Sequence, residues 1–161
     1  MSRLNASTIY LLISVMLVWA ANGLCFTLLA LRMSIEGLDT TDIGLVTTGY
    51  FFGQLLGAIF FGKIIERVGH VRAFAACASL LSASVIGYVF YIDLLFWICI
   101  RLVHGMCVAG LLMVVESWLN GSVSNNGRGR ILALYTIIQS LSMSMGPVSY
   151  THLTLPTNRE V

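Results

Sequence analysis

The chain has 161 residues, of which 58% are hydrophobic and only 10% are charged. A soluble domain carries about 25% charged residues, so this composition excludes a water-soluble globule and predicts a protein embedded in a lipid bilayer. The net charge of +2 gives no reason to expect a nucleic-acid partner.

Five apolar segments are long enough to cross a membrane, since a spanning helix needs about 20 apolar residues. They lie approximately at residues 8–31, 43–62, 73–92, 94–118 and 131–147. Lipid offers no hydrogen-bond partners to the backbone, so each segment is expected to be a continuous helix. We therefore predict an all-α integral membrane fold, with residues 1–147 forming one N-terminal transmembrane domain.

The first two spans carry polar or small residues at interior positions. The first span is too long for the apolar core of a cleavable signal peptide, which runs about 7–15 residues. Its mid-span amide, Asn22, needs a polar partner and is a candidate for facing a substrate cavity. In the second span, Gly53 and Gly57 form a GxxxG pattern, which predicts close packing on a neighbouring helix.

Basic residues collect in the connections that follow the second and fourth spans. Lysine and arginine in short connections mark the cytoplasmic side. The sequence therefore predicts a multi-pass membrane protein with its N-terminus in the cytoplasm. The basic residues of these two connections are Lys63, Arg67, Arg72, Arg128 and Arg130.

The fourth span contains a cationic side chain well inside the membrane. Arg101 lies eight residues past Asp93, or about 12 Å along a helix. Arginine at that depth costs roughly 2.5–3.5 kcal/mol on insertion scales. Two interpretations stay open: Arg101 lines a central cavity or couples protons, or it hydrogen-bonds backbone carbonyls and holds the first helix.

Other polar residues on the fourth and fifth spans are candidates for substrate contact. His104 shares a helix face with Arg101, and either binds substrate or a proton or packs as a neutral histidine. Tyr135 and Gln139 share a face of the fifth span and are candidate substrate contacts. Glu116, about 22 Å along the helix from Arg101, is expected near the cytoplasmic end. Three interpretations of Glu116 stay open. It forms an ion pair in a gate or in the structure, it couples protons, or it is a solvated surface acid.

Several classes of site are not expected. The four cysteines form no CxxC pair, so neither a zinc site nor a disulfide framework is predicted. The sequence contains no nucleophile–base pair, phosphate-binding loop or HExxH motif. We therefore expect no enzyme activity, no ATP-driven pump and no cofactor.

Three short motifs lie in or beside the second, fourth and fifth spans. Residues 62–72 fit the pattern G-x-x-x-[DE]-R-x-G-x-[RK], although glutamate replaces the commoner aspartate and Ala73 replaces a frequent second base. In the fourth span, Arg101 begins an R-x-x-x-G motif, with His104 where glutamine is frequent. The fifth span reaches a Gly146–Pro147 pair. The residues that fit the first pattern are Gly62, Glu66, Arg67, Gly69 and Arg72.

Together these motifs resemble the major facilitator superfamily, and Glu116 with residues 117–120 and 128–130 resembles its YcaD-like branch. The resemblance implies that the chain holds five spans of the N-terminal six-helix half of a twelve-helix fold. It further implies secondary active transport of a small organic solute across a bacterial inner membrane, coupled to protons, with residues 62–72 as a cytoplasmic gate. The partners implied are the lipid bilayer, the solute and the missing C-terminal half. A non-transporting receptor-like or assembly subunit that reuses the fold is the alternative.

The last residues differ in character from the spans before them. VSYTHLTLPT, which begins at Val148, resembles one reading frame of a transposase-type sequencing adapter. A sample index would supply the next three residues, and the adapter's following bases encode Val and a stop. We therefore expect residues 148–161 to be a non-native tail and the native protein to be interrupted within its fifth span.

Overall fold

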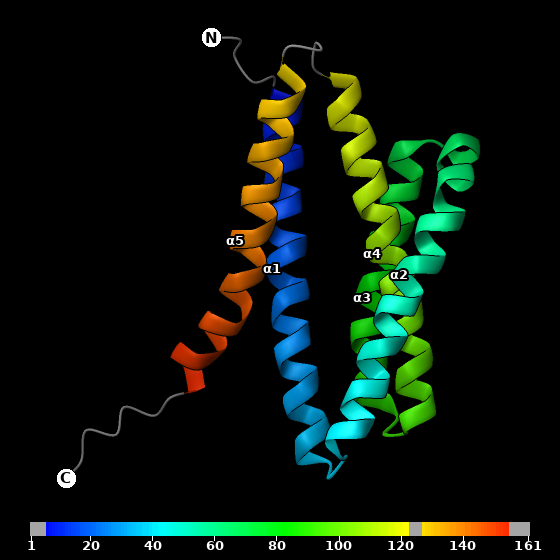
Figure 1. Ribbon diagram of the computed structural model, residues 1–161, viewed down its shortest axis with the longest axis vertical. Helices are drawn as coiled ribbons and strands as arrows, with labels where there is room; N and C mark the ends of the chain where they lie inside the picture. The colour runs from blue at the N-terminus through cyan, green and yellow to red at the C-terminus, as the bar shows by residue number, and fades with distance from the viewer. Residues whose placement is uncertain (1–5, 123–126, 155–161) are drawn as a thin grey trace, which may run out of the picture. The chain divides into compact units, whose positions relative to one another are not determined.

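The computed structural model describes residues 6–122 and 127–154, and within them every regular element is a helix. This confirms the predicted all-α class and its five spans (Figure 1). The helices are α1 (Ala6–Ile35), α2 (Thr40–Val68), α3 (His70–Phe90), α4 (Leu94–Ser122) and α5 (Arg128–Thr154).

All five helices are long and apolar enough to cross a membrane. The shortest, α3, has 21 residues and therefore extends about 31 Å, close to the thickness of a hydrocarbon core. Large apolar side chains remain exposed along the helices, among them Phe51, Phe52 and Phe60 of α2. Such an exterior suits acyl chains, so the chain is a multi-pass membrane protein.

The helices extend beyond the predicted spans, most clearly at the end of α2. Residues 62–72 were expected to form a connecting turn, but α2 continues to Val68 and α3 begins at His70. Lys63, Glu66 and Arg67 end the apolar run without ending the helix, because lysine, glutamate and arginine are good helix formers. Hydropathy therefore marks where α2 leaves the bilayer, whereas the helix itself continues beyond that point.

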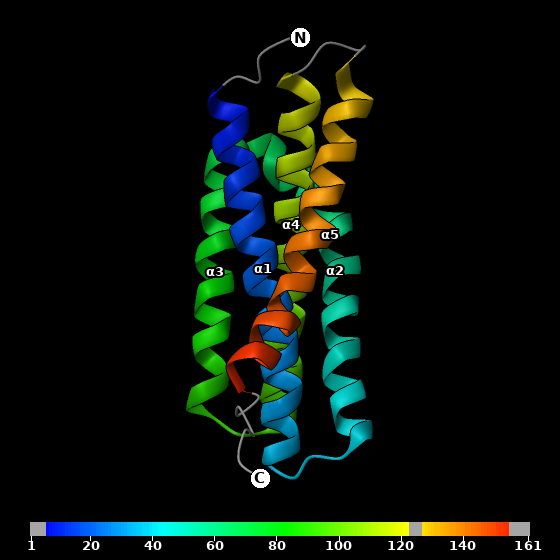
Figure 2. The ribbon, with the colours of Figure 1, turned by 90° about the vertical axis from the view of Figure 1, so that its left-hand side faces the viewer.

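The chain divides into two compact units, and each is described by itself. One contains residues 33–118, with α2, α3 and most of α4. The other contains residues 1–32 and 119–161, with most of α1 and all of α5. In the first unit α4 lies between α2 and α3 (Figure 2).

Glycines bring α2 and α4 into backbone contact. A Cβ on Gly53 would strike the carbonyl oxygen of Leu102, and one on Gly57 would lie 2.7 Å from the oxygen of Met106. From the other side, a Cβ on Gly105 would strike the carbonyl oxygen of Tyr50. The packing predicted from the GxxxG pattern is therefore confirmed, with α4 as the neighbour.

The other unit pairs α1 with α5 through small residues in the same way. A Cβ on Gly23 would strike the carbonyl oxygen of Met143, and one on Gly146 would strike the backbone nitrogen of Leu24. Helix α5 continues through Pro147 to Thr154. Residues 155–161 lie outside the described residues, and the non-native origin of residues 148–161 stays a prediction.

Candidate functional site

The connection between α2 and α3 is a single residue in a conformation that only glycine adopts easily. Gly69 has φ 86° and ψ 159°, a region of backbone space that costs other residues about 1–3 kcal/mol. Its N–H donates to the carbonyl of Ile65 at 2.9 Å, and its own carbonyl accepts from Ala73 at 3.1 Å. The chain therefore reverses between two long helices within one residue.

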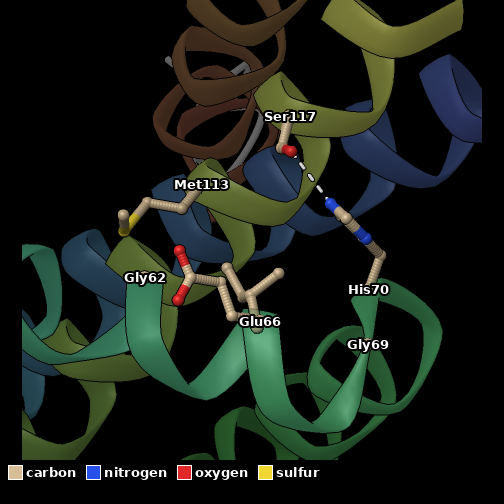
Figure 3. Close-up of a pocket in the computed structure, with 7 residues that line it drawn as sticks. Gly62, Glu66, Gly69, His70, Met113 and Ser117 are labelled. Atoms are coloured by element: carbon tan, nitrogen blue, oxygen red, sulfur yellow. Dashed lines mark hydrogen bonds between the residues drawn. The ribbon is translucent and has the colours of Figure 1, made fainter.

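A pocket of about 410 Å³ lies beside this turn, between α2, the start of α3 and α4. Figure 3 shows the carboxylate of Glu66 reaching from α2 toward Met113 of α4. On the other side, His70 Nε2 and Ser117 Oγ are hydrogen-bonded at 2.8 Å. The pocket is lined by Gly62, Ile65, Glu66, Gly69, His70, Met113 and Ser117.

The structure brings three of the predicted gate residues, Gly62, Glu66 and Gly69, to this pocket. Arg67 and Arg72 are exposed on either side of the turn, in the last turn of α2 and the first turn of α3. The pocket itself thus offers a carboxylate, an imidazole, a hydroxyl and a thioether. Carboxylate and hydroxyl oxygens accept hydrogen bonds, so this lining suits a cationic or hydrogen-bond-donating group.

The remaining predicted gate residues lie elsewhere on the helices. Glu116 is exposed on α4, one residue before the pocket residue Ser117. Near the start of α5, Arg130 is exposed. The Nε–H of Arg128, at the start of α5, donates to the carbonyl of Asn120 near the end of α4 at 3.1 Å.

Deeper in α4, Arg101 is buried between aromatic rings of α2 and α3. Its guanidinium carbon lies 5.3 Å from the ring centroid of Tyr50 and 5.9 Å from that of Tyr88. A cation over an aromatic face within about 6 Å is attracted by the ring quadrupole, by about 2 kcal/mol where water is excluded. Only 2% of Arg101 is exposed, and both tyrosine rings lie beside its guanidinium group.

His104 lies against the same tyrosine, one turn further along α4. Its ring centroid is 6.0 Å from that of Tyr50, so the predicted shared face of Arg101 and His104 is confirmed. His104 Nδ1 is 2.8 Å from the Ser84 hydroxyl of α3. Gln54 donates to the Tyr50 hydroxyl at 3.1 Å. Side chains of three helices thus meet around Arg101 and His104, and we call this group the Arg101 cluster: Tyr50, Gln54, Ser84, Tyr88, Arg101 and His104.

Three predicted substrate contacts belong to the other unit. Asn22 of α1 and Tyr135 of α5 are buried, with exposed fractions of 5% and 3%. Gln139, one turn after Tyr135 on α5, is half-buried. Their roles stay predictions.

Sequence reasoning did not single out the partners that α3 and the turn contribute, namely Ser84, Tyr88 and His70. A signal for the first two exists, because the buried residues of α3 include Cys77, Ser84 and Tyr88, seven and four residues apart. That spacing places them on one helix face. No comparable pattern marks His70, whose partner Ser117 is 47 residues away in the sequence.

In the described residues, five helices able to span a membrane, a one-residue turn at Gly69 flanked by charged side chains, and a buried arginine define a helical membrane protein. A sequence profile of the Major Facilitator Superfamily matches residues 11–155, and the chain belongs to this family. The expected resemblance is thereby confirmed.

Individual relatives agree with the family match. The chain is 30% identical over 153 residues to Ent638_1421 of Enterobacter sp. (strain 638), described as an uncharacterized MFS-type transporter, covering 95% of this chain and 40% of that protein. It is also 30% identical over 146 residues to the uncharacterized MFS-type transporter YcaD of Salmonella newport (strain SL254), covering 91% of this chain and 38% of that protein. The chain thus spans about two fifths of the length of the curated relatives it matches.

Proposed function

We propose that this chain is the N-terminal part of a secondary active transporter that moves a small organic solute, coupled to protons. The complete protein has two helical halves that rock around a site near the middle of the bilayer. It lies in a bacterial inner membrane, with its N-terminus and the α2–α3 turn in the cytoplasm. The basic residues Lys63, Arg67 and Arg72 beside this turn support that orientation.

The observation that carries the proposal is the pocket beside Gly69. Glu66 presents a carboxylate there, next to the hydrogen-bonded pair of His70 and Ser117. An exposed carboxylate at a tight turn between two rigid helices can pair with a cationic group or a helix N-terminus of the other half. Forming and breaking that pair would bias the protein between inward-open and outward-open states, which makes the pocket a cytoplasmic gate.

The Arg101 cluster is the proposed part of the solute or proton pathway within this chain. A buried ionisable side chain in a membrane span marks such pathways more often than plain packing. Arg101 and His104 would act there. Asn22 of α1 and Tyr135 and Gln139 of α5 are proposed as further contacts of the solute. Glu116, Arg128 and Arg130 would contribute ion pairs at the cytoplasmic end.

The test begins with the source DNA, sequenced across codon 147 so that the complete reading frame can be expressed. The full-length protein is then reconstituted in liposomes that contain a pH-sensitive dye. A panel of organic cations, organic anions and neutral solutes is added under an imposed proton gradient. We expect at least one solute to cause proton movement and to accumulate, relative to protein-free liposomes. If no solute does either, the receptor-like or assembly role is favoured instead.

A further inference from the structure

We propose that Cys77 of α3 and Cys107 of α4 form a binding site for Cu⁺ inside the unit of residues 33–118. The two sulfur atoms hold the ion between them and so join α3 to α4. The site uses no residue of the pocket beside Gly69 or of the Arg101 cluster. It therefore goes beyond the proposed function and does not depend on which solute the protein transports.

The two cysteines meet where α3 packs on α4. Their thiols are hydrogen-bonded to each other, and neither takes part in a disulfide. The Sγ atom of Cys77 also lies against the backbone of α4, because a Cβ added at Gly110 would be 2.9 Å from it. Gly110 is about one helical turn after Cys107. The packing of the two helices therefore places two sulfur donors side by side.

Burial holds this pair in place and keeps water away from it. Each of the two cysteines is 2% exposed, and the ring of Phe61 from α2 lies against the same Gly110. A single buried cysteine packs as a small apolar side chain. Two of them in direct contact on rigid helices are in addition a pair of soft donors, which no water molecule competes to solvate.

The number and the type of the donors determine which metal fits. Thiolates are soft ligands that favour Cu⁺ and Zn²⁺. A structural Zn²⁺ takes four ligands, whereas in the part of the chain that the structure describes no group of three or more histidine, cysteine, aspartate or glutamate side chains could hold a metal ion. Cu⁺ has a filled d shell and forms stable complexes with two sulfur ligands, so Cu⁺ fits a site of two thiols.

Binding of Cu⁺ leaves the charge of the buried site unchanged. One thiol loses its proton to water and forms a thiolate–copper bond, and the other thiol coordinates through a sulfur lone pair. Copper remains Cu⁺, and neither sulfur is oxidised. One singly charged ion thus replaces one proton, which avoids the cost of burying a net charge. Because both cysteines are buried, the ion enters when the contact of α3 with α4 opens locally.

Titration of the full-length protein with Cu⁺ tests the proposal without knowledge of the solute. The protein is kept in detergent, reduced and free of oxygen, and bicinchoninate serves as a coloured competitor for Cu⁺. Cys77→Ser and Cys107→Ser each remove one donor, and the alanine variants replace them if they do not fold. Cys99→Ser is the matched control, because Cys99 is an exposed free cysteine on α4. Thermal unfolding without copper shows that each variant is folded.

We expect the wild type and Cys99→Ser to bind a first Cu⁺ at least about a hundredfold more tightly than Cys77→Ser or Cys107→Ser, because the second sulfur acts from within the same molecule. X-ray absorption on the wild type with one equivalent of Cu⁺ should show two sulfur neighbours, and this measurement needs no variant. Zn²⁺ should not be retained by the pair.

Three results would overturn the inference. The first is equal Cu⁺ affinity in the wild type and in either variant of the pair. The second is an equal loss of affinity in Cys99→Ser. The third is a first Cu⁺ bound by nitrogen or oxygen, or Zn²⁺ that the wild type retains and Cys77→Ser does not. None of these results depends on whether the protein transports a solute, so failure of this site and failure of the proposed function are distinguishable.

Discussion

The interior of the α2–α3–α4 unit and the pocket beside Gly69 are built from the same three helices but in opposite ways. In the interior, Gly53 and Gly105 leave no room for even one added carbon, and Arg101 is buried against aromatic rings. At the pocket, Glu66 and His70 are exposed, and nothing lies within 4 Å of a Cβ added at Gly69. Close packing resists change, whereas an open pocket can gain and lose partners. Substitutions should therefore affect stability in the interior and transport at the pocket.

The largest expected effect is at the contact of α2 with α4. Gly53→Val should destabilise the protein by about 3 kcal/mol or more, because its side chain meets the backbone of Leu102. Gly44→Val is the control, since a Cβ at Gly44 has no atom within 4 Å; it should change stability by less than about 0.5 kcal/mol. Thermal unfolding of the full-length protein in detergent measures both. Equal losses at the two positions would contradict the packing described here.

Removing the ring that Arg101 and His104 share should have the next largest effect. Tyr50→Leu loses the cation–π contact and part of the packed volume, which we expect to cost about 2 kcal/mol. Tyr50→Phe keeps the ring and loses only the hydroxyl that accepts from Gln54, at about 1 kcal/mol. Thermal unfolding should rank wild type above Tyr50→Phe and Tyr50→Phe above Tyr50→Leu. If the phenylalanine variant is the less stable of the two, the ring is not the main support of Arg101.

Gly69 is the position at the pocket where a substitution should reduce stability, because of its backbone conformation. Gly69→Ala should cost about 2 kcal/mol, because an L side chain is strained at φ 86° even though space is available. Gly62→Ala, on the helical part of the same motif, has its nearest contact with Met113 at 3.7 Å. It should gain up to about 1 kcal/mol from helix propensity. Chemical unfolding measures the change in the free energy of unfolding for each variant. Changes of opposite sign would support the backbone argument, and changes of the same sign would contradict it.

The smallest expected effect on stability is at the hydrogen bond between His70 and Ser117. Ser117→Ala removes the hydroxyl that meets His70 at 2.8 Å. Because both residues are exposed, the cost should be about 0.5 kcal/mol, measured by thermal unfolding. A loss comparable to that of Gly53→Val would mean that the pocket is part of the packed interior.

Much of this architecture could be predicted from the sequence, because hydropathy alone reports a membrane span. The close packing at Gly53 could also be anticipated, since a GxxxG pattern lies on one helix face, but the sequence did not identify α4 as the neighbour. The end of α2 could not, because charge ends the apolar run at residue 62 while the helix continues to Val68. Helix α2 ends where Gly69 adopts a positive φ.

Some residues of the Arg101 cluster could be predicted from the sequence, and others could not. Arg101 is conspicuous because charge is expensive inside a membrane, and its spacing from His104 gives their common face. Ser84 and Tyr88 are ordinary residues of a membrane helix, and their importance depends on which face of α3 meets α4. The spacing of Ser84 and Tyr88 places them on one face of α3, but tertiary packing decides that this face meets α4.

The central claim is that the pocket beside Gly69 controls transport, and Glu66→Gln in the full-length protein tests it most directly. The rate of proton-coupled uptake is measured in liposomes with the solute that the panel identifies. Glu36→Gln, an exposed glutamate between α1 and α2, is the matched control. We predict that Glu66→Gln slows transport at least about tenfold, within the range of typical coupling energies, with unchanged thermal stability, while Glu36→Gln transports normally. Wild-type transport by Glu66→Gln would contradict the account.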